Sequence, residues 1–165
     1  MYDDGLEFNV NGIKWFLDNV WPMMVDQDPE LKLIIGGTVC EKIPKDKYSN
    51  IGLLGRVDSL DNFYRQGDVV INPVSQGTGL KIKTFEALSY GKVVIVHPHS
   101  SQGIYQRDTA PLLLATQPAE WVKIISKIFM DRDQVQEIKQ KDETYILEMN
   151  NYINSQYSSF LSESN

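Results

Sequence analysis

The stretch that most constrains the fold runs over residues 69–96, VVINPVSQGTGLKIKTFEALSYGKVVIV. It opens with an apolar run, residues 69–71, and closes with another, residues 93–96, each typical of a strand buried on both faces. Between them Leu80, Thr84, Phe85 and Leu88 recur at helical spacing, and Gly91 stands where a helix commonly ends. The pattern predicts strand, turn, helix and strand, which is the crossover unit of a parallel sheet.

The turn inside this unit carries two glycines, Gly77 and Gly79, and two lysines, Lys81 and Lys83. Glycine accepts backbone conformations and close approaches that a side chain would block. A turn that feeds a helix N-terminus also presents free backbone N–H groups and the positive end of the helix dipole. We therefore expect an anion to bind at this turn.

The rest of the chain repeats the alternation of strands and helices. We expect strands over residues 31–35, 51–54 and 112–115. Helices are expected over residues 12–25, 59–64, 118–130 and 134–152, with Pro22 bending or ending the first, Asp58 or Ser59 capping the second, and Phe129 on the inner face of the third.

This order predicts an α/β fold with a Rossmann-like, doubly wound parallel sheet and helices on both faces. We expect residues 1–165 to form one domain, with residues 133–165 as a C-terminal helical extension. Ligands in such sheets bind beyond the carboxyl ends of the strands, which is where the glycine turn follows its strand.

Composition narrows the range of partners. The net charge of −6 argues against a broad nucleic-acid footprint, so basic residues are expected to act locally, at one anionic ligand. A single cysteine, Cys40, excludes an internal disulfide and is expected to be a small buried residue. No apolar stretch is long enough to span a bilayer and the N-terminus lacks a signal-peptide pattern, so we expect a cytoplasmic protein, at most peripheral to the inner face of a membrane.

Several segments together resemble a known family. The run GTGLKIKTFEALSYGKVVIV is preceded by INP and by IGLLGRVDSLDNFYRQGD, while NVNGIKWFLDNVWP and PELKLIIGG stand nearer the N-terminus. These residues resemble the C-terminal, donor-binding domain of retaining glycosyltransferases of the GT-B fold, of the family 4 or group 1 type. That family includes bacterial mannosyl- and glucosyltransferases of surface-polysaccharide synthesis. The resemblance covers roughly residues 9–130 and is more specific than a glycine motif alone.

The resemblance implies a site for a nucleotide-diphosphate sugar. The turn residues Gly77, Thr78, Gly79 and Leu80 would cradle the diphosphate. Lys81 or Lys83 would neutralise its charge and stabilise the leaving phosphate. No metal and no cofactor are expected, because the nucleotide-sugar is itself the substrate.

The same resemblance places the nucleoside. Glu86 would accept hydrogen bonds from the ribose hydroxyls, a role that suits an ionised carboxylate with two acceptor oxygens. Gly55, Arg56 and Val57 match the segment that lies beside the nucleobase.

The sequence departs from the family pattern in two places. Many relatives carry an acidic residue where this chain has Thr78, so the form of the motif with two carboxylates is absent. Nothing before Asn9 indicates the strand with which the family domain normally begins. A GT-B enzyme also needs an N-terminal acceptor domain, so we expect this chain to be the donor half of a longer hexosyltransferase and to be inactive alone.

Plainer interpretations stay open for most of these residues. Gly77 and Gly79 could form a simple tight turn, Lys83 and Glu86 an exposed ion pair, and Arg56 a solvated surface residue. His97 and His99 could suggest a metal site, but no further ligands are evident, so we expect a loop near the donor sugar. Trp15, Trp21 and Trp121 are expected in the core.

Two other functions also stay open. One is a GT-B enzyme that hydrolyses or epimerises a nucleotide-sugar without an acceptor. The other is a non-catalytic Rossmann-like module that binds a partner and holds no ligand at its glycine turn.

Overall fold

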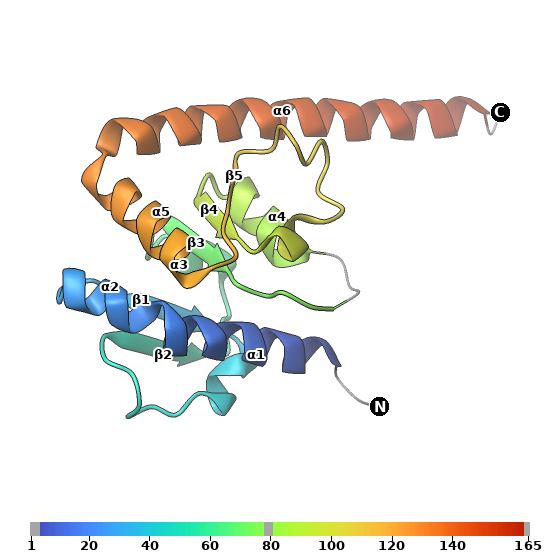
Figure 1. Cartoon of the computed structure of the whole chain (residues 1–165). Coiled ribbons are helices and arrows are strands. Elements are labelled where there is room, and N and C mark those ends of the chain that lie inside the picture. Colours follow the sequence, from blue (N-terminus) through green and yellow to red (C-terminus); the bar gives the residue numbers. More distant parts are fainter. Residues whose placement is uncertain (1–3, 78–80, 164–165) are drawn as a thin grey trace.

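The computed structural model describes residues 4–77 and 81–163 (Figure 1). Its strands are β1 (Leu33–Gly36), β2 (Ile51–Gly55), β3 (Val69–Asn72), β4 (Val93–Val96) and β5 (Leu112–Leu114). Every recorded pairing between them is parallel, with β1 beside β2 and the order β3-β4-β5. The expected α/β class with a parallel, Rossmann-like arrangement is confirmed, with the ladder hydrogen bonds divided between these two groups of strands.

Helices connect the strands. They are α1 (Asp4–Asn19), α2 (Trp21–Gln27), α3 (Leu60–Tyr64), α4 (Ile82–Ser89), α5 (Pro118–Met130) and α6 (Arg132–Glu163), with 3-10 turns η1 (Thr38–Lys42) and η2 (Pro98–Ser101). The single helix expected over residues 12–25 is wrong in its bounds: helix starts at Asp4 and is interrupted at Val20. Pro22 accounts for the interruption, as expected, because it has no N–H for the preceding turn and is favoured in the first turn of a new helix.

Strand β4 lies at the centre of the fold. Its four side chains are completely buried, and they alternate between two hydrophobic clusters. Val93 and Ile95 belong to the cluster that contains residues of α1, α2 and α5, whereas Val94 and Val96 belong to the cluster of α3, α4 and α6. Helices therefore cover both faces of the sheet, and α6 runs above α4 in Figure 1.

The sequence pattern was less successful for β3, which was expected to be buried on both faces. All four of its residues are only half-buried, because β3 is the edge strand of the β3-β4-β5 group. Phe129 is likewise 53% exposed and not on the inner face. The buried stripe of α5 passes through Trp121 and Ile128, and Phe129 is the next residue around the helix.

Local signals at chain reversals agree with the structure. Ser59 caps α3 by accepting a hydrogen bond from the backbone N–H of Asn62 (3.3 Å). Gly91 has φ 63°, and its N–H donates to the Leu88 carbonyl (2.8 Å) while that of Lys92 donates to the Ala87 carbonyl (3.2 Å). This Schellman arrangement ends α4 where the glycine predicted.

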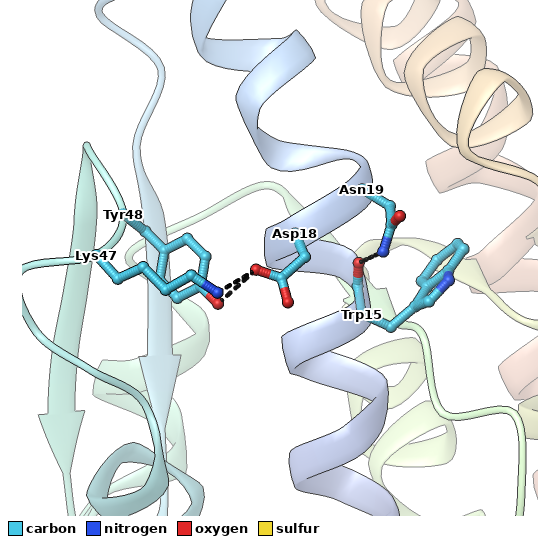
Figure 2. A network of polar contacts seen from close by, with 5 residues as sticks. All are labelled: Trp15, Asp18, Asn19, Lys47 and Tyr48. Atoms are coloured by element: carbon cyan, nitrogen blue, oxygen red, sulfur yellow. Dashed lines mark hydrogen bonds and ion pairs between the residues drawn. The ribbon is translucent and has the colours of Figure 1, made fainter.

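Polar contacts hold the loop before β2 against α1 (Figure 2). The Asp18 carboxylate accepts hydrogen bonds from Lys47 Nζ (2.6 Å) and from the Tyr48 hydroxyl (2.8 Å). These two hydrogen bonds lower the pKa of Asp18 below its usual value. Trp21 adds a bond from its indole N–H to the Ser49 carbonyl (2.8 Å), so both helices fix the approach to β2.

The structure also bears on three expectations about buried or membrane-spanning residues. Cys40 is buried, as are Trp21 and Trp121, whereas Trp15 is half-buried against the same cluster. Among the residues that the structure describes, no helix is long and apolar enough to cross a membrane.

The contact of α1 with the segment after β3 depends on Gly12. A Cβ at Gly12 would lie 2.9 Å from the Val74 Cα atom and 3.1 Å from the Pro73 carbonyl oxygen. Alanine normally stabilises a helix interior, but here the clash should outweigh that gain, and we expect Gly12→Ala to lower the free energy of unfolding by about 1–2 kcal/mol. Urea unfolding would measure this. The control is Gly67→Ala, whose Cβ would meet nothing nearer than the Val69 carbonyl at 3.9 Å; equal losses in both variants would contradict the packing explanation.

Helix α6 carries a buried acid. Asp142 is 1% exposed, and neither of its carboxylate oxygens has a hydrogen-bond partner among the described residues. Burial, with a smaller contribution from the charge of Glu143, raises the pKa of Asp142 to about 7 from a usual value of 3.8. The folded chain therefore holds this proton over a pH range in which the unfolded chain has lost it.

Because the pKa of Asp142 is higher in the folded chain than in the unfolded chain, the free energy of unfolding decreases as the pH increases from about 4 to about 7. We expect this loss to amount to roughly 2–4 kcal/mol. In Asp142→Asn the free energy of unfolding should fall much less over that range. Urea unfolding at several pH values tests this, and parallel pH profiles for the two proteins would contradict it.

Candidate functional site

The glycine turn follows β3 and leads into α4. Gly77 is the last described residue on the β3 side of the turn. Lys81 is the N-cap residue of α4, and Lys83 and Glu86 lie within the helix. The predicted site residues Thr78, Gly79 and Leu80 lie outside the described residues. The structure thus places Gly77, the two lysines and the glutamate along one strand-to-helix connection at the carboxyl end of β3.

Buried hydrogen bonds fix the start of this connection. The Asn72 side-chain amide donates to Thr84 Oγ1 (2.9 Å), and that hydroxyl donates to the Ser100 carbonyl oxygen (2.8 Å). Ser100 Oγ in turn donates to the Val74 carbonyl oxygen (2.7 Å). Since Thr84 and Ser100 are fully buried, these bonds tie the end of β3 to α4 and η2.

A second set of polar contacts is centred on the carbonyl oxygen of Gly77. Lys81 Nζ donates to it (3.2 Å), and His99 Nε2 lies 2.7 Å from the same oxygen and 3.0 Å from Lys81 Nζ. The tautomer of His99 decides whether Nε2 donates to the oxygen or accepts from the lysine. The loop after β4 therefore contacts Gly77 and Lys81 through His99.

Gly77 itself could not carry a side chain without strain. Its φ is 109°, and an added Cβ would lie 3.1 Å from Phe8 Cδ2 of α1. Phe8 of α1 thus packs against Gly77. This contact could not be predicted, because Phe8 and Gly77 are far apart in the sequence.

The neighbouring histidine has a structural partner. His97 Nδ1 accepts a hydrogen bond from the His99 backbone N–H (3.1 Å), and burial, followed by the proximity of His99, lowers the pKa of His97. No group of three or more His, Cys, Asp or Glu residues that could hold a metal ion occurs in the described part of the chain.

The two lysines differ in their surroundings. Lys81 is half-buried, and its amine is engaged by Gly77 and His99. Lys83 is exposed in the first turn of α4, and no ion pair between it and Glu86 is recorded within the described ranges. Lys81 is thus the lysine in direct contact with the turn, and Lys83 points its charge into solvent near the start of the helix.

Glu86 faces α3. The Tyr64 hydroxyl donates a long hydrogen bond to Glu86 Oε2 (3.5 Å), and the Tyr64 ring stacks on that of Tyr90, with centroids 4.5 Å apart. The Tyr90 hydroxyl instead donates to Asp61 Oδ1 (2.8 Å). Burial, with a smaller effect of the Glu86 charge, raises the pKa of Tyr64 to about 12, so its hydroxyl stays a donor at neutral pH.

The segment expected beside the nucleobase follows β2. Gly55 has φ 67°, and its carbonyl accepts a hydrogen bond from the Gly37 N–H (2.6 Å). The Arg56 side chain is 91% exposed and lies 3.5 Å from the Asp58 carboxylate, an arrangement that a plain surface arginine would also show. Val57 packs closely on Gly36, where an added Cβ would lie 2.6 Å from Val57 Cγ2.

Helix α3 connects this segment to the glycine turn. An added Cβ at Gly36 would also meet the Phe63 ring (2.9 Å), and Phe63 contacts the ring of Tyr64 edge-on, with centroids 5.4 Å apart. Helix α3 therefore contacts Gly36 through Phe63 and Glu86 through Tyr64. Within the described residues no hydrogen bond is recorded directly between residues 55–57 and the connection from Gly77 to Glu86.

Two comparisons with known proteins agree with this arrangement. The chain is 25% identical over 127 residues to an uncharacterized 44.6 kDa protein in the cps region of Klebsiella pneumoniae, a match that covers 71% of this chain and 33% of that protein. This chain thus matches about a third of the length of that relative. Residues 5–131 match the family model of the group 1 glycosyl transferases. Since the match extends over most of the sequence, the chain belongs to the group 1 glycosyl transferase family.

Proposed function

We propose that this chain is the donor-binding half of a hexosyltransferase, which transfers a sugar from a nucleotide-diphosphate sugar to an acceptor in bacterial surface-polysaccharide or glycan synthesis. The observation that carries the proposal is the connection from β3 to α4, where Gly77, Lys81 and Glu86 follow one another at the carboxyl end of a parallel strand. Family membership supports glycosyl transfer, and the cps region of the Klebsiella relative supports a role in polysaccharide synthesis.

In this proposal the glycine turn binds the diphosphate. Backbone N–H groups of residues 77–80 and the N-terminus of α4 would face the phosphate oxygens, on which charge develops as the glycosidic bond breaks. Lys81 and Lys83 would balance that charge. The buried bonds from Asn72 and Ser100 support this role, because they fix the segment after β3 and helix α4, which flank the turn.

The nucleoside would lie between α4 and the end of β2. Glu86 would accept hydrogen bonds from the ribose hydroxyls, and the backbone of residues 55–57 would lie along the base. Because the Arg56 side chain is exposed, it would contribute little to binding of the nucleoside. No metal is assigned to this site.

We further propose that the acceptor site and any general base belong to other parts of the full-length protein. The match to about a third of the Klebsiella relative supports this division. On this view the chain binds a donor but completes no transfer alone, and the enzyme works in the cytoplasm.

Product analysis with the full-length protein tests the proposed reaction. The protein would be incubated with radiolabelled UDP-, GDP- and ADP-sugars and with membranes that carry acceptor glycans. We expect release of the nucleoside diphosphate together with label on the acceptor. Free sugar would indicate a hydrolase and an isomerised nucleotide-sugar an epimerase, and either product alone, or no turnover of any donor, would contradict the proposal.

A further inference from the structure

We propose that Tyr64 is a positioning residue for the donor, whose hydroxyl orients the Glu86 carboxylate toward the ribose and thereby sets the selectivity for ribose over deoxyribose. The inference rests on the proposed function, because it assigns a partner to the glutamate of that site. It goes beyond it by placing a residue of α3, far from the glycine turn in sequence, in donor recognition.

The position of Tyr64 suits this task. Tyr64 is 6% exposed, and its ring makes two aromatic contacts: Phe63 meets it edge-on at 5.4 Å, and Tyr90 stacks on it at 4.5 Å with an angle of 17° between the rings. A buried ring with two such contacts has few alternative rotamers. The hydroxyl is therefore delivered to one place, 3.5 Å from Glu86 Oε2.

The hydrogen-bonding capacity of Glu86 leaves room for a ribose. A carboxylate has two oxygens and about four acceptor sites, and Tyr64 occupies one of these on Oε2. Oε1 has no recorded partner in the described part of the chain. One oxygen anchored by the tyrosine and one left open is an arrangement that can receive a diol without first losing a protein contact.

Removal of the Tyr64 hydroxyl should weaken only the binding of the ribose. Without it the Glu86 side chain can sample more rotamers, and its ordering on binding would cost free energy. The diphosphate contacts are made elsewhere, at Gly77 and the lysines, and should not change. The expected signature is a loss of discrimination between a ribonucleotide and its deoxy counterpart.

Tyr90 offers a matched control. It belongs to the same aromatic stack, but its hydroxyl donates to Asp61 Oδ1 (2.8 Å) and not to Glu86. Tyr64→Phe and Tyr90→Phe each remove one hydroxyl from the stack and retain both rings. A general effect on packing should therefore appear in both variants, and an effect through Glu86 only in the first.

The test is calorimetric titration of this chain with UDP, GDP and ADP and with their 2′-deoxy forms. For the nucleotide that binds, we expect wild type and Tyr90→Phe to prefer the ribose form, and Tyr64→Phe to reduce that preference by roughly 3- to 10-fold. The affinity of Tyr64→Phe for the deoxy form should fall less than that for the ribose form, because the deoxy form offers Glu86 only the 3′-hydroxyl. In a Glu86→Gln background, Tyr64→Phe should alter the preference much less.

Each other outcome overturns the inference. If wild type prefers the ribose form and Tyr64→Phe keeps the full preference, Tyr64 has no positioning role, although the donor site stands. If Tyr64→Phe weakens both forms equally, or if Tyr90→Phe behaves like it, the residue acts through packing. If wild type binds none of the nucleotides, the proposed donor site fails and the inference fails with it.

Discussion

Replacement of Glu86 by alanine in the full-length enzyme is expected to weaken donor binding by roughly 100-fold or more. The physical reason is the loss of charge-assisted hydrogen bonds between the carboxylate and the ribose hydroxyls, each worth about 1.5–3 kcal/mol. Calorimetry with the nucleoside diphosphate of the preferred donor measures the change. An unchanged affinity would remove Glu86 from the ribose site.

A glutamate away from the site provides the control for that measurement. Glu137 forms an exposed ion pair with Lys141 on α6 (2.7 Å), and its removal takes away the same charge from the chain. We expect Glu137→Ala to bind the donor as wild type does. Similar losses in both variants would point to the net charge of the protein and not to a contact with ribose.

The second large effect is expected at the lysines. Lys81 contacts the Gly77 carbonyl, so its ammonium is already at the turn that would hold the diphosphate. If it stabilises the charge that develops on the leaving phosphate, Lys81→Ala should lower kcat by roughly 100-fold. Lys83→Ala should lower kcat as well, and turnover at the wild-type rate would exclude either residue from the phosphate role.

Steady-state kinetics of the full-length enzyme measure kcat for these lysine variants and for a control variant. Lys141→Ala removes an equally charged but distant side chain, exposed on α6, and should leave kcat unchanged. A loss of turnover in that control as large as in Lys81→Ala would show that the effect is one of overall charge.

The parts of the fold that could be predicted are those that local chemistry determines. Strand β4 is a run of four buried aliphatic residues, and α5 begins at a proline, so both agree with the expected positions. The true start of α1 was missed, because acidic residues and a glycine dominate its first turn, and the contact of Phe8 with Gly77 joins segments far apart in the sequence. The exposure of β3 depends on its place at a sheet edge, which no residue of its own encodes.

In the candidate site, the order of residues close in sequence could likewise be predicted, whereas contacts between distant residues could not. The order of Gly77, Lys81 and Glu86 along one connection was evident, because these residues are close in sequence. The contacts of Tyr64 with Glu86 and of His99 with Gly77 were not, since each joins residues about twenty positions apart without a periodic pattern. The buried bonds of Thr84 were also missed, because its helical spacing indicated packing and gave no sign of its hydroxyl partners.

The most direct test of the account is a titration of this chain with UDP, GDP and ADP while backbone chemical shifts are recorded. We expect one of these nucleotides to shift the resonances of residues 77–86 and 55–58 and to leave those of α2 and of α6 unchanged. An absence of shifts at millimolar nucleotide, or shifts confined to other surfaces, would contradict the assignment of this connection as a donor site.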